Sequence, residues 1–223
     1  MNWTVFGAVS VFVLGLLSGN LAAFTARKAS GKNKIPYFII ELVTAAALLS
    51  LFLNYGVSFK FLFFVFFAFI LIIVSAIDYY TRTIPDILPL ALTLLAALFC
   101  FYNVDIGNHL SQRFINAALG FVIGGGVLIA IGFVGKLIYK KETIGGGDVK
   151  LMAAVGAWLG LEKVLLAIFI AALLGSLFGL VLILTKKIDR KSYIPFAPFL
   201  AAGSFVTVFA PQITVVACCK YLF

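Results

Sequence analysis

Two aspartates in this sequence of 223 residues could form a catalytic carboxylate pair. Asp78 stands at the end of an apolar stretch that is expected to be helical, where the helix dipole disfavours a negative charge. Asp148 follows Gly145-Gly146-Gly147 and opens a later apolar stretch, where the dipole favours the anion. In aspartic proteolysis, an ionised carboxylate takes a proton from water while a protonated one donates a hydrogen bond to the scissile carbonyl. Opposite charge preferences therefore suit this pair to acid–base chemistry.

The glycines before Asp148 allow competing interpretations. Without side chains, they would let an extended peptide backbone approach the aspartate. A phosphate-binding loop is the alternative, but the segment lacks the Gly-Lys-Ser/Thr signature of such loops. Asp148 could also act only as a helix cap.

The other acidic residues carry weaker signals. Asp86 directly follows Pro85 and precedes an expected helix, where an N-cap role is natural. Glu41 lies near the start of another expected helix and either favours its N-terminus electrostatically or lines an internal polar cavity. Asp105 is near the only histidine, His109, and one histidine does not make a metal site, so we predict no bound metal.

The composition indicates that the solvent of this chain is lipid. Hydrophobic residues make up 64% of the sequence, with only 17 Lys or Arg and eight Asp or Glu. No water-soluble fold of this size hides that much apolar surface. The net charge of +9 would suggest nucleic acid in a soluble protein, but here it indicates basic loops that set membrane orientation.

Apolar segments separated by short polar breaks predict an all-α protein with about eight transmembrane helices in a single domain over residues 1–223. The expected spans are 3–24, 37–55, 61–77, 87–103, 114–138, 149–161, 164–185 and 195–218. The span 149–161 is short, at roughly 20 Å against about 30 Å of hydrocarbon. Its shortness suggests that Asp148 lies near membrane depth.

The distribution of basic residues predicts the orientation. Of the 17 basic residues, 13 lie in or beside every second connection, namely those after the first, third, fifth and seventh expected helices. The four exceptions are Lys60, Arg113, Lys163 and Lys220. We therefore expect the basic connections, with Asp78 and Asp148, on the cytoplasmic side and both termini outside. The first apolar run has no basic segment before it, because the first basic residue is Arg27, so we expect a retained helix rather than a signal peptide.

Small residues and cysteines give expectations about packing. Glycines spaced by four let helix backbones approach closely in lipid, and the sequence has four such pairs: Gly15 and Gly19, Gly120 and Gly124, Gly156 and Gly160, and Gly175 and Gly179. Cys100, Cys218 and Cys219 form no Cys-x-x-Cys pair. Apolar packing is the favoured interpretation of all three, although a disulfide is conceivable.

Three segments make the sequence resemble the bacterial type IV prepilin peptidases, a family of membrane aspartic proteases. They run from Asp78 to Asp86 (DYYTRTIPD), from Gly145 to Leu151 (GGGDVKL) and from Tyr193 to Leu200 (YIPFAPFL). Pro36-Tyr37 with Glu41-Leu42-Val43-Thr44 also resembles the start of that family's second helix.

The resemblance implies a multi-pass protein of the bacterial inner membrane that acts in type IV pilus formation or protein secretion. Its expected activity is cleavage of the basic leader from prepilins or pseudopilins in the membrane, at the cytoplasmic face. The family pattern makes Asp78 and Asp148 the catalytic pair. Around them, it implies supporting roles for Asp86, Pro85, Gly145, Gly146, Gly147, Lys150 and Glu41.

The sequence also departs from the family pattern. Many bacterial members have a large cytoplasmic loop with two Cys-x-x-Cys pairs and methylate the new N-terminus with S-adenosylmethionine. Here the corresponding loop runs only from about Thr25 to Pro36 and contains no cysteine, so methyl transfer stays open. Proteolysis itself requires no cofactor. The alternatives are an archaeal-type preflagellin peptidase and, in a different class, a small membrane transporter or channel.

Overall fold

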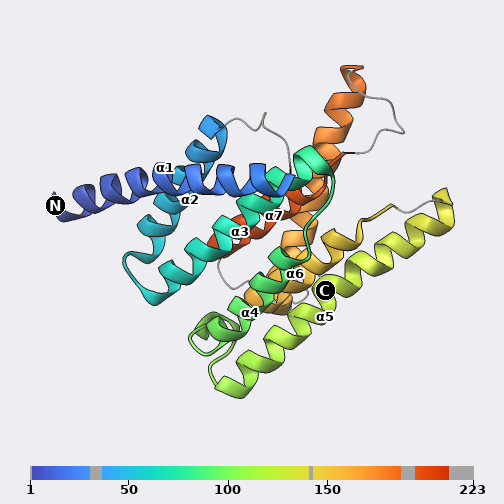
Figure 1. Ribbon diagram of the computed structural model, residues 1–223. Helices are drawn as coiled ribbons and strands as arrows, with labels where there is room; N and C mark the ends of the chain where they lie inside the picture. The colour runs from blue at the N-terminus through green and yellow to red at the C-terminus, as the bar shows by residue number, and fades with distance from the viewer. Residues whose placement is uncertain (1, 31–36, 141–142, 187–193, 211–223) are drawn as a thin grey trace. The chain divides into compact units, whose positions relative to one another are not determined.

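The computed structural model describes residues 2–30, 37–140, 143–186 and 194–210, and this part of the chain contains helices and connections but no strand (Figure 1). The elements in chain order are α1 (Asn2–Ser30), α2 (Tyr37–Tyr55), α3 (Phe59–Thr81), α4 (Ile87–Cys100), the 3-10 helix η1 (Val104–Ile106), α5 (Leu110–Tyr139), α6 (Gly146–Leu184) and α7 (Ala197–Phe209). The predicted all-α class is confirmed. By length and composition, five of the described helices could cross a membrane, namely α1, α2, α3, α5 and α6.

The chain folds as two compact units, Met1–Pro85 and Asp86–Phe223. In the first unit, α1 and α2 pack antiparallel with their backbones in close approach. A Cβ atom on Gly15 would lie 2.5 Å from Cα of Ala45, and one on Gly19 would lie 2.5 Å from Cα of Glu41. The close packing predicted for this glycine pair is confirmed.

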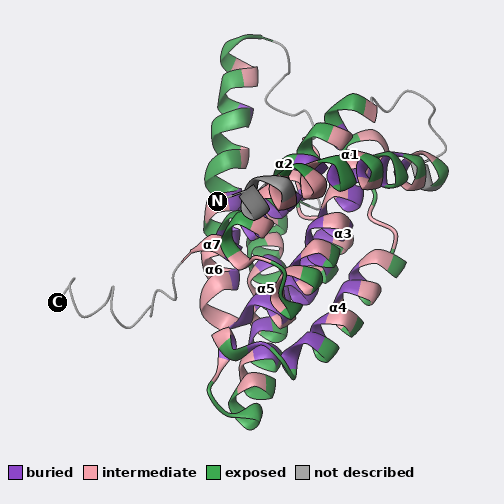
Figure 2. Cartoon of the chain, turned by 90° about the vertical axis from the view of Figure 1, so that its left-hand side faces the viewer, coloured by how far each residue is buried: buried purple, intermediate pink, exposed green. Residues whose placement is uncertain are grey.

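Helix α3 completes the first unit and presents one continuous buried stripe. Phe64, Phe67, Leu71 and Val74 are all nearly inaccessible and repeat at the three- and four-residue spacing of one helix face (Figure 2). The helix begins at Ser58, whose hydroxyl accepts a hydrogen bond from the backbone N–H of Phe61 at 3.2 Å.

In the second unit, α5 and α6 form the most extensive helix pair, again antiparallel. A Cβ atom on Gly120 would lie 2.1 Å from the carbonyl oxygen of Gly156, and one on Gly124 would lie 2.3 Å from that of Met152. Only glycine permits this separation. The later pair differs from the prediction, since Gly175 and Gly179 face the side chains of α7 and the segment before it rather than another helix backbone.

Helix α6 is interrupted at Gly160, where φ is 80° and ψ is 175°. L-residues with a side chain essentially never adopt this conformation, so a glycine is required. Ile106 packs directly against Gly160, and Asn103 Nδ2 donates to the carbonyl oxygen of Trp158 at 3.2 Å, so the loop around η1 supports the break. The expected helices 149–161 and 164–185 correspond to the two parts of α6 on either side of it.

Several expectations concern residues that the structure describes only in part. The span predicted over 195–218 is described as α7 alone, and Cys218 and Cys219 lie outside the described residues. Cys100 is a free, buried thiol packed with Ile106 and Ala117, which confirms the packing interpretation for that cysteine. Eight membrane crossings with both termini outside stay a prediction.

Candidate active site

Asp78 lies on the buried face of α3, within one turn of its C-terminus. It continues the stripe of Phe64, Phe67, Leu71 and Val74, and only 3% of its surface is exposed. The helix ends because Arg82 adopts a left-handed conformation (φ 57°), and its backbone N–H donates to the carbonyl oxygen of Asp78 at 2.8 Å. Asp78 therefore stands where the sequence predicts, at the negative end of a helix dipole.

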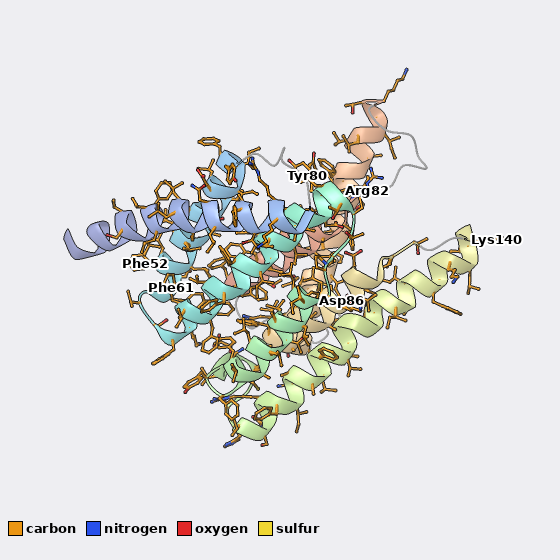
Figure 3. The ribbon with its side chains drawn as sticks, in the orientation of Figure 1. Phe52, Phe61, Tyr80, Arg82, Asp86 and Lys140 are labelled. Carbon is orange, nitrogen blue, oxygen red and sulfur yellow. The ribbon has the colours of Figure 1, made fainter. Side chains whose placement is uncertain are left out.

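Polar side chains surround this end of α3. Thr81 Oγ1 donates to the carbonyl oxygen of Ile77 at 2.8 Å, and Thr83 Oγ1 donates to Thr81 Oγ1 at 3.0 Å. Figure 3 shows Tyr80 and Arg82 at the same end of the helix. The carboxyl group of Asp78 is therefore buried, while the helix terminus next to it is polar and hydrogen-bonded.

Arg27, which the sequence marks only as one of the basic residues that set membrane orientation, makes contacts at the end of α1. Its guanidinium lies over the ring of Tyr37, with Cζ 3.8 Å from the ring centroid. It also interacts electrostatically with Tyr80, which follows Asp78 on α3. The half-buried cation therefore joins the end of α1 to α2 and α3. The spacing of an arginine and a tyrosine across a polar loop gave no signal for this contact.

Asp148 occupies the first turn of α6. Gly145 is the N-cap residue with extended backbone (φ −72°, ψ 141°), and its carbonyl oxygen accepts from the backbone N–H of Asp148 at 3.1 Å. The aspartate is buried, with 4% of its surface exposed, and lies at the positive end of the helix dipole. Its predicted place at a helix N-terminus is confirmed.

The glycines before Asp148 are not one extended segment. Gly146 and Gly147 already belong to α6, and only Gly145 has extended backbone. Gly146 is nevertheless exposed, and a Cβ atom there would meet nothing within 4 Å. The approach to this turn is therefore open on the side of Gly146.

Asp86 and Lys150 form an ion pair within the second unit. Lys150 Nζ donates to both carboxylate oxygens of Asp86 at 2.7 Å, and Figure 3 shows Asp86 at the start of α4. Asp86 does occupy the N-cap position of α4, but its side chain makes no capping hydrogen bond. The prediction of a side-chain cap is therefore wrong, because the carboxylate binds the ammonium of Lys150 and no backbone N–H of α4.

The remaining predicted residues lie outside this pair. Pro85 ends the first unit in the connection between α3 and α4. Glu41 is half-buried on α2 beyond its first turn, where the backbone of α1 passes at Gly19. Its position weakens the interpretation as a charge that favours the helix N-terminus. Among the described residues, no three His, Cys, Asp or Glu side chains lie together as a metal site.

The structure thus brings together two predicted residues, Asp86 and Lys150, which are far apart in the sequence. Asp78 belongs to the first unit and Asp148 to the second, so their pairing stays a prediction. Both are nonetheless buried carboxyl groups at helix ends of opposite polarity in an apolar, all-helical chain. This combination defines a membrane protein with two candidate catalytic aspartates.

Comparison with known proteins identifies the family. The model of the type IV leader peptidase family matches residues 64–180, more than half of the chain, and the matched region contains Asp78, Asp86, Asp148 and Lys150. The chain belongs to the type IV leader peptidase family. This confirms the resemblance seen in the sequence.

Several relatives are described as prepilin leader peptidase/N-methyltransferase. The protein of Xanthomonas campestris is 29% identical over 197 residues, covering 85% of this chain and 67% of the relative. The protein of Burkholderia pseudomallei is 41% identical over 140 residues, covering 62% of this chain and 43% of the relative. The protein of Bacillus subtilis is 34% identical over 171 residues, covering 76% of this chain and 64% of the relative. The chain therefore matches only part of each relative's length, and no solved structure matches it.

Proposed function

We propose that this protein is a membrane aspartic endopeptidase that removes the basic leader from type IV prepilins or pseudopilins. Asp78 and Asp148 are its catalytic pair. The observation that carries the proposal is that Asp78 and Asp148, both in the family-matched region, are buried, at 3% and 4% exposure, at helix ends of opposite polarity. Buried carboxyl groups in an apolar helical protein are costly and mark functional sites.

The helix positions support different roles for the two carboxyl groups. Asp148, at a helix N-terminus, is the ionised base that takes a proton from water as the water oxygen attacks the scissile carbonyl carbon. Asp78, at a helix C-terminus, is the protonated partner that donates to the carbonyl oxygen. The tetrahedral intermediate then collapses, the C–N bond breaks and the leaving amine takes the proton that Asp148 accepted from water, which leaves Asp148 ionised again.

The charges of each unit support a cytoplasmic site in the inner membrane. Arg27 and Arg82 lie at the end of the first unit that carries Asp78. In the second unit, Lys136 and Lys140 end α5, and Lys150 follows Asp148 on α6. Basic residues concentrate on the cytoplasmic side of membrane proteins.

Methyl transfer is not part of the proposal, although the relatives' names include it. S-adenosylmethionine has a charged sulfonium, a ribose and an adenine, which require polar partners. The groove next to Asp86 and Lys150 is lined mainly by apolar side chains and supplies few such partners, and methyl transfer stays open. Membership in the leader peptidase family also favours the peptidase over a transporter or channel.

Cleavage of a prepilin by purified protein in detergent tests the proposal. Asp78→Asn and Asp148→Asn should each lower kcat/KM by about 100-fold or more, because each removes an acid or base from the reaction. Asp105→Asn is the matched control, since it makes the same change in the loop at η1 and should leave cleavage intact. Thermal unfolding of all variants shows whether they are folded. Full activity in either Asp78→Asn or Asp148→Asn would refute the assignment.

A further inference from the structure

An apolar groove of about 680 Å³ runs between three helices of the second unit. Its walls include Leu90 and Thr93 from α4, Val122 and Ile129 from α5, and Val149 and Ala153 from α6. The Asp86–Lys150 ion pair, the only charged residues in the lining, marks one end. The groove therefore joins a long apolar surface to a single charged position.

The charged end of the groove lies beside the candidate catalytic carboxylate. Val149 and Lys150 directly follow Asp148 in the first turns of α6, and both line the groove. The pair is open to solvent, because 72% of the Asp86 side chain and 55% of the Lys150 side chain are exposed. An exposed ion pair is weak and can exchange partners with charged groups of a ligand.

We propose that this groove binds the apolar residues of the peptide substrate next to the scissile bond, while Asp86 and Lys150 recognise charge at the junction. The inference rests on the proposed peptidase function. Two features favour a peptide occupant. The groove lining begins at Val149, the residue after Asp148, and the exposed pair at its end offers both a carboxylate and an ammonium to charged groups of a peptide.

Gly126 of α5 keeps the groove open. It lines the groove, and a Cβ atom there would meet nothing within 4 Å. A larger side chain at this position would project into the groove without disturbing the helix packing. The neighbouring glycine, Gly124, is unlike it, because its missing Cβ permits the contact with α6.

Substitution of Gly126 by leucine tests the groove kinetically. Gly126→Leu should raise KM for a prepilin and lower kcat/KM about tenfold, which corresponds to about 1.4 kcal/mol, with kcat nearly unchanged. Ala130→Leu is the matched control, since Ala130 is exposed one turn further along α5 and does not line the groove. Gly126→Ala, which fills less of the groove, should give a smaller effect. If wild-type protein cleaves and Gly126→Leu cleaves with the same KM, the groove proposal is wrong and the peptidase function stands.

Crosslinking gives a readout that does not depend on turnover. A photoreactive benzoylphenylalanine in place of Val122, whose side chain is 63% exposed in the groove, should crosslink to an uncleaved prepilin in the Asp78→Asn background. The same group in place of Leu137, which is 66% exposed on α5 outside the groove, should not. Crosslinks to lipid or detergent alone at Val122 would overturn the proposal. If wild-type protein cleaves no prepilin, the proposed function itself fails.

Discussion

Asp78 and Asp86 lie on consecutive helices, but their surroundings differ in the property that decides their chemistry. Asp78 is 3% exposed on an apolar stripe, whereas the Asp86 side chain is 72% exposed and bound to Lys150. Burial strengthens the electrostatic interactions of a carboxyl group, while solvent screens them at the surface. The two aspartates are therefore expected to respond differently to the same substitution.

Removing the charge of Asp86 should have a small effect. Asp86→Asn is expected to lower unfolding stability by no more than about 1 kcal/mol, because exposed ion pairs contribute little. Its kcat should stay close to that of wild type, with a modest rise in KM if the pair recognises charge on the substrate. The exchanged pair, Asp86→Lys with Lys150→Asp, should restore the stability but invert the preference for charge near the scissile bond. A loss of kcat as large as in Asp78→Asn would place Asp86 in the catalytic machinery instead.

At the scale of the helices, glycine sets how closely α5 and α6 can pack. A Cβ atom on Gly156 would lie 1.9 Å from the carbonyl oxygen of Gly120, so Gly156→Ala forces the two backbones apart. We expect a loss of about 1–3 kcal/mol, as for other overpacked contacts, and a lower midpoint of thermal unfolding in detergent. Gly126→Ala is the matched control for stability, since the same change on α5 meets open space. Equal midpoints for the two variants would contradict this role of the close contact.

The helices also show which structural features the sequence could predict. The place of Asp78 follows from the end of an apolar run, and the place of Asp148 follows from the glycines before another. The buried stripe on α3 could not be predicted, because the residues around it are apolar as well. The positive φ of Gly160 could not be predicted in the same way. The expected spans 149–161 and 164–185 do place a break near this point, but a glycine spaced by four from another suggests packing alone, and only the backbone angles show that the break falls at Gly160.

At the scale of the whole molecule, the limit of sequence reasoning is contact between distant segments. The ion pair of Asp86 and Lys150 joins two motifs separated by two helices, and neither motif contains a signal for the other. Hydropathy does predict the class of protein, because lipid imposes apolar helices on every segment independently, while the orientation that the charges indicate stays a prediction. Hydropathy and charge do not determine whether Asp78 and Asp148 meet, since the two residues belong to different units.

The orientation of each unit can be tested with single cysteines that leave all charges unchanged. In a background of Cys100→Ala, Cys218→Ser and Cys219→Ser, we expect Thr83→Cys and Thr143→Cys to react with a membrane-impermeant maleimide only after the cells are permeabilised. Both positions are exposed at the unit ends that carry Asp78 and Asp148.

Cysteines at the opposite ends of the same units provide the matched controls. Val57, which is 90% exposed between α2 and α3, and Asn108, which is exposed before α5, should react in intact cells when replaced by cysteine. The basic ends of both units are then cytoplasmic, as the charge distribution predicts. If Thr83→Cys and Thr143→Cys react from opposite sides, Asp78 and Asp148 face different compartments, and the catalytic pair proposed here cannot form.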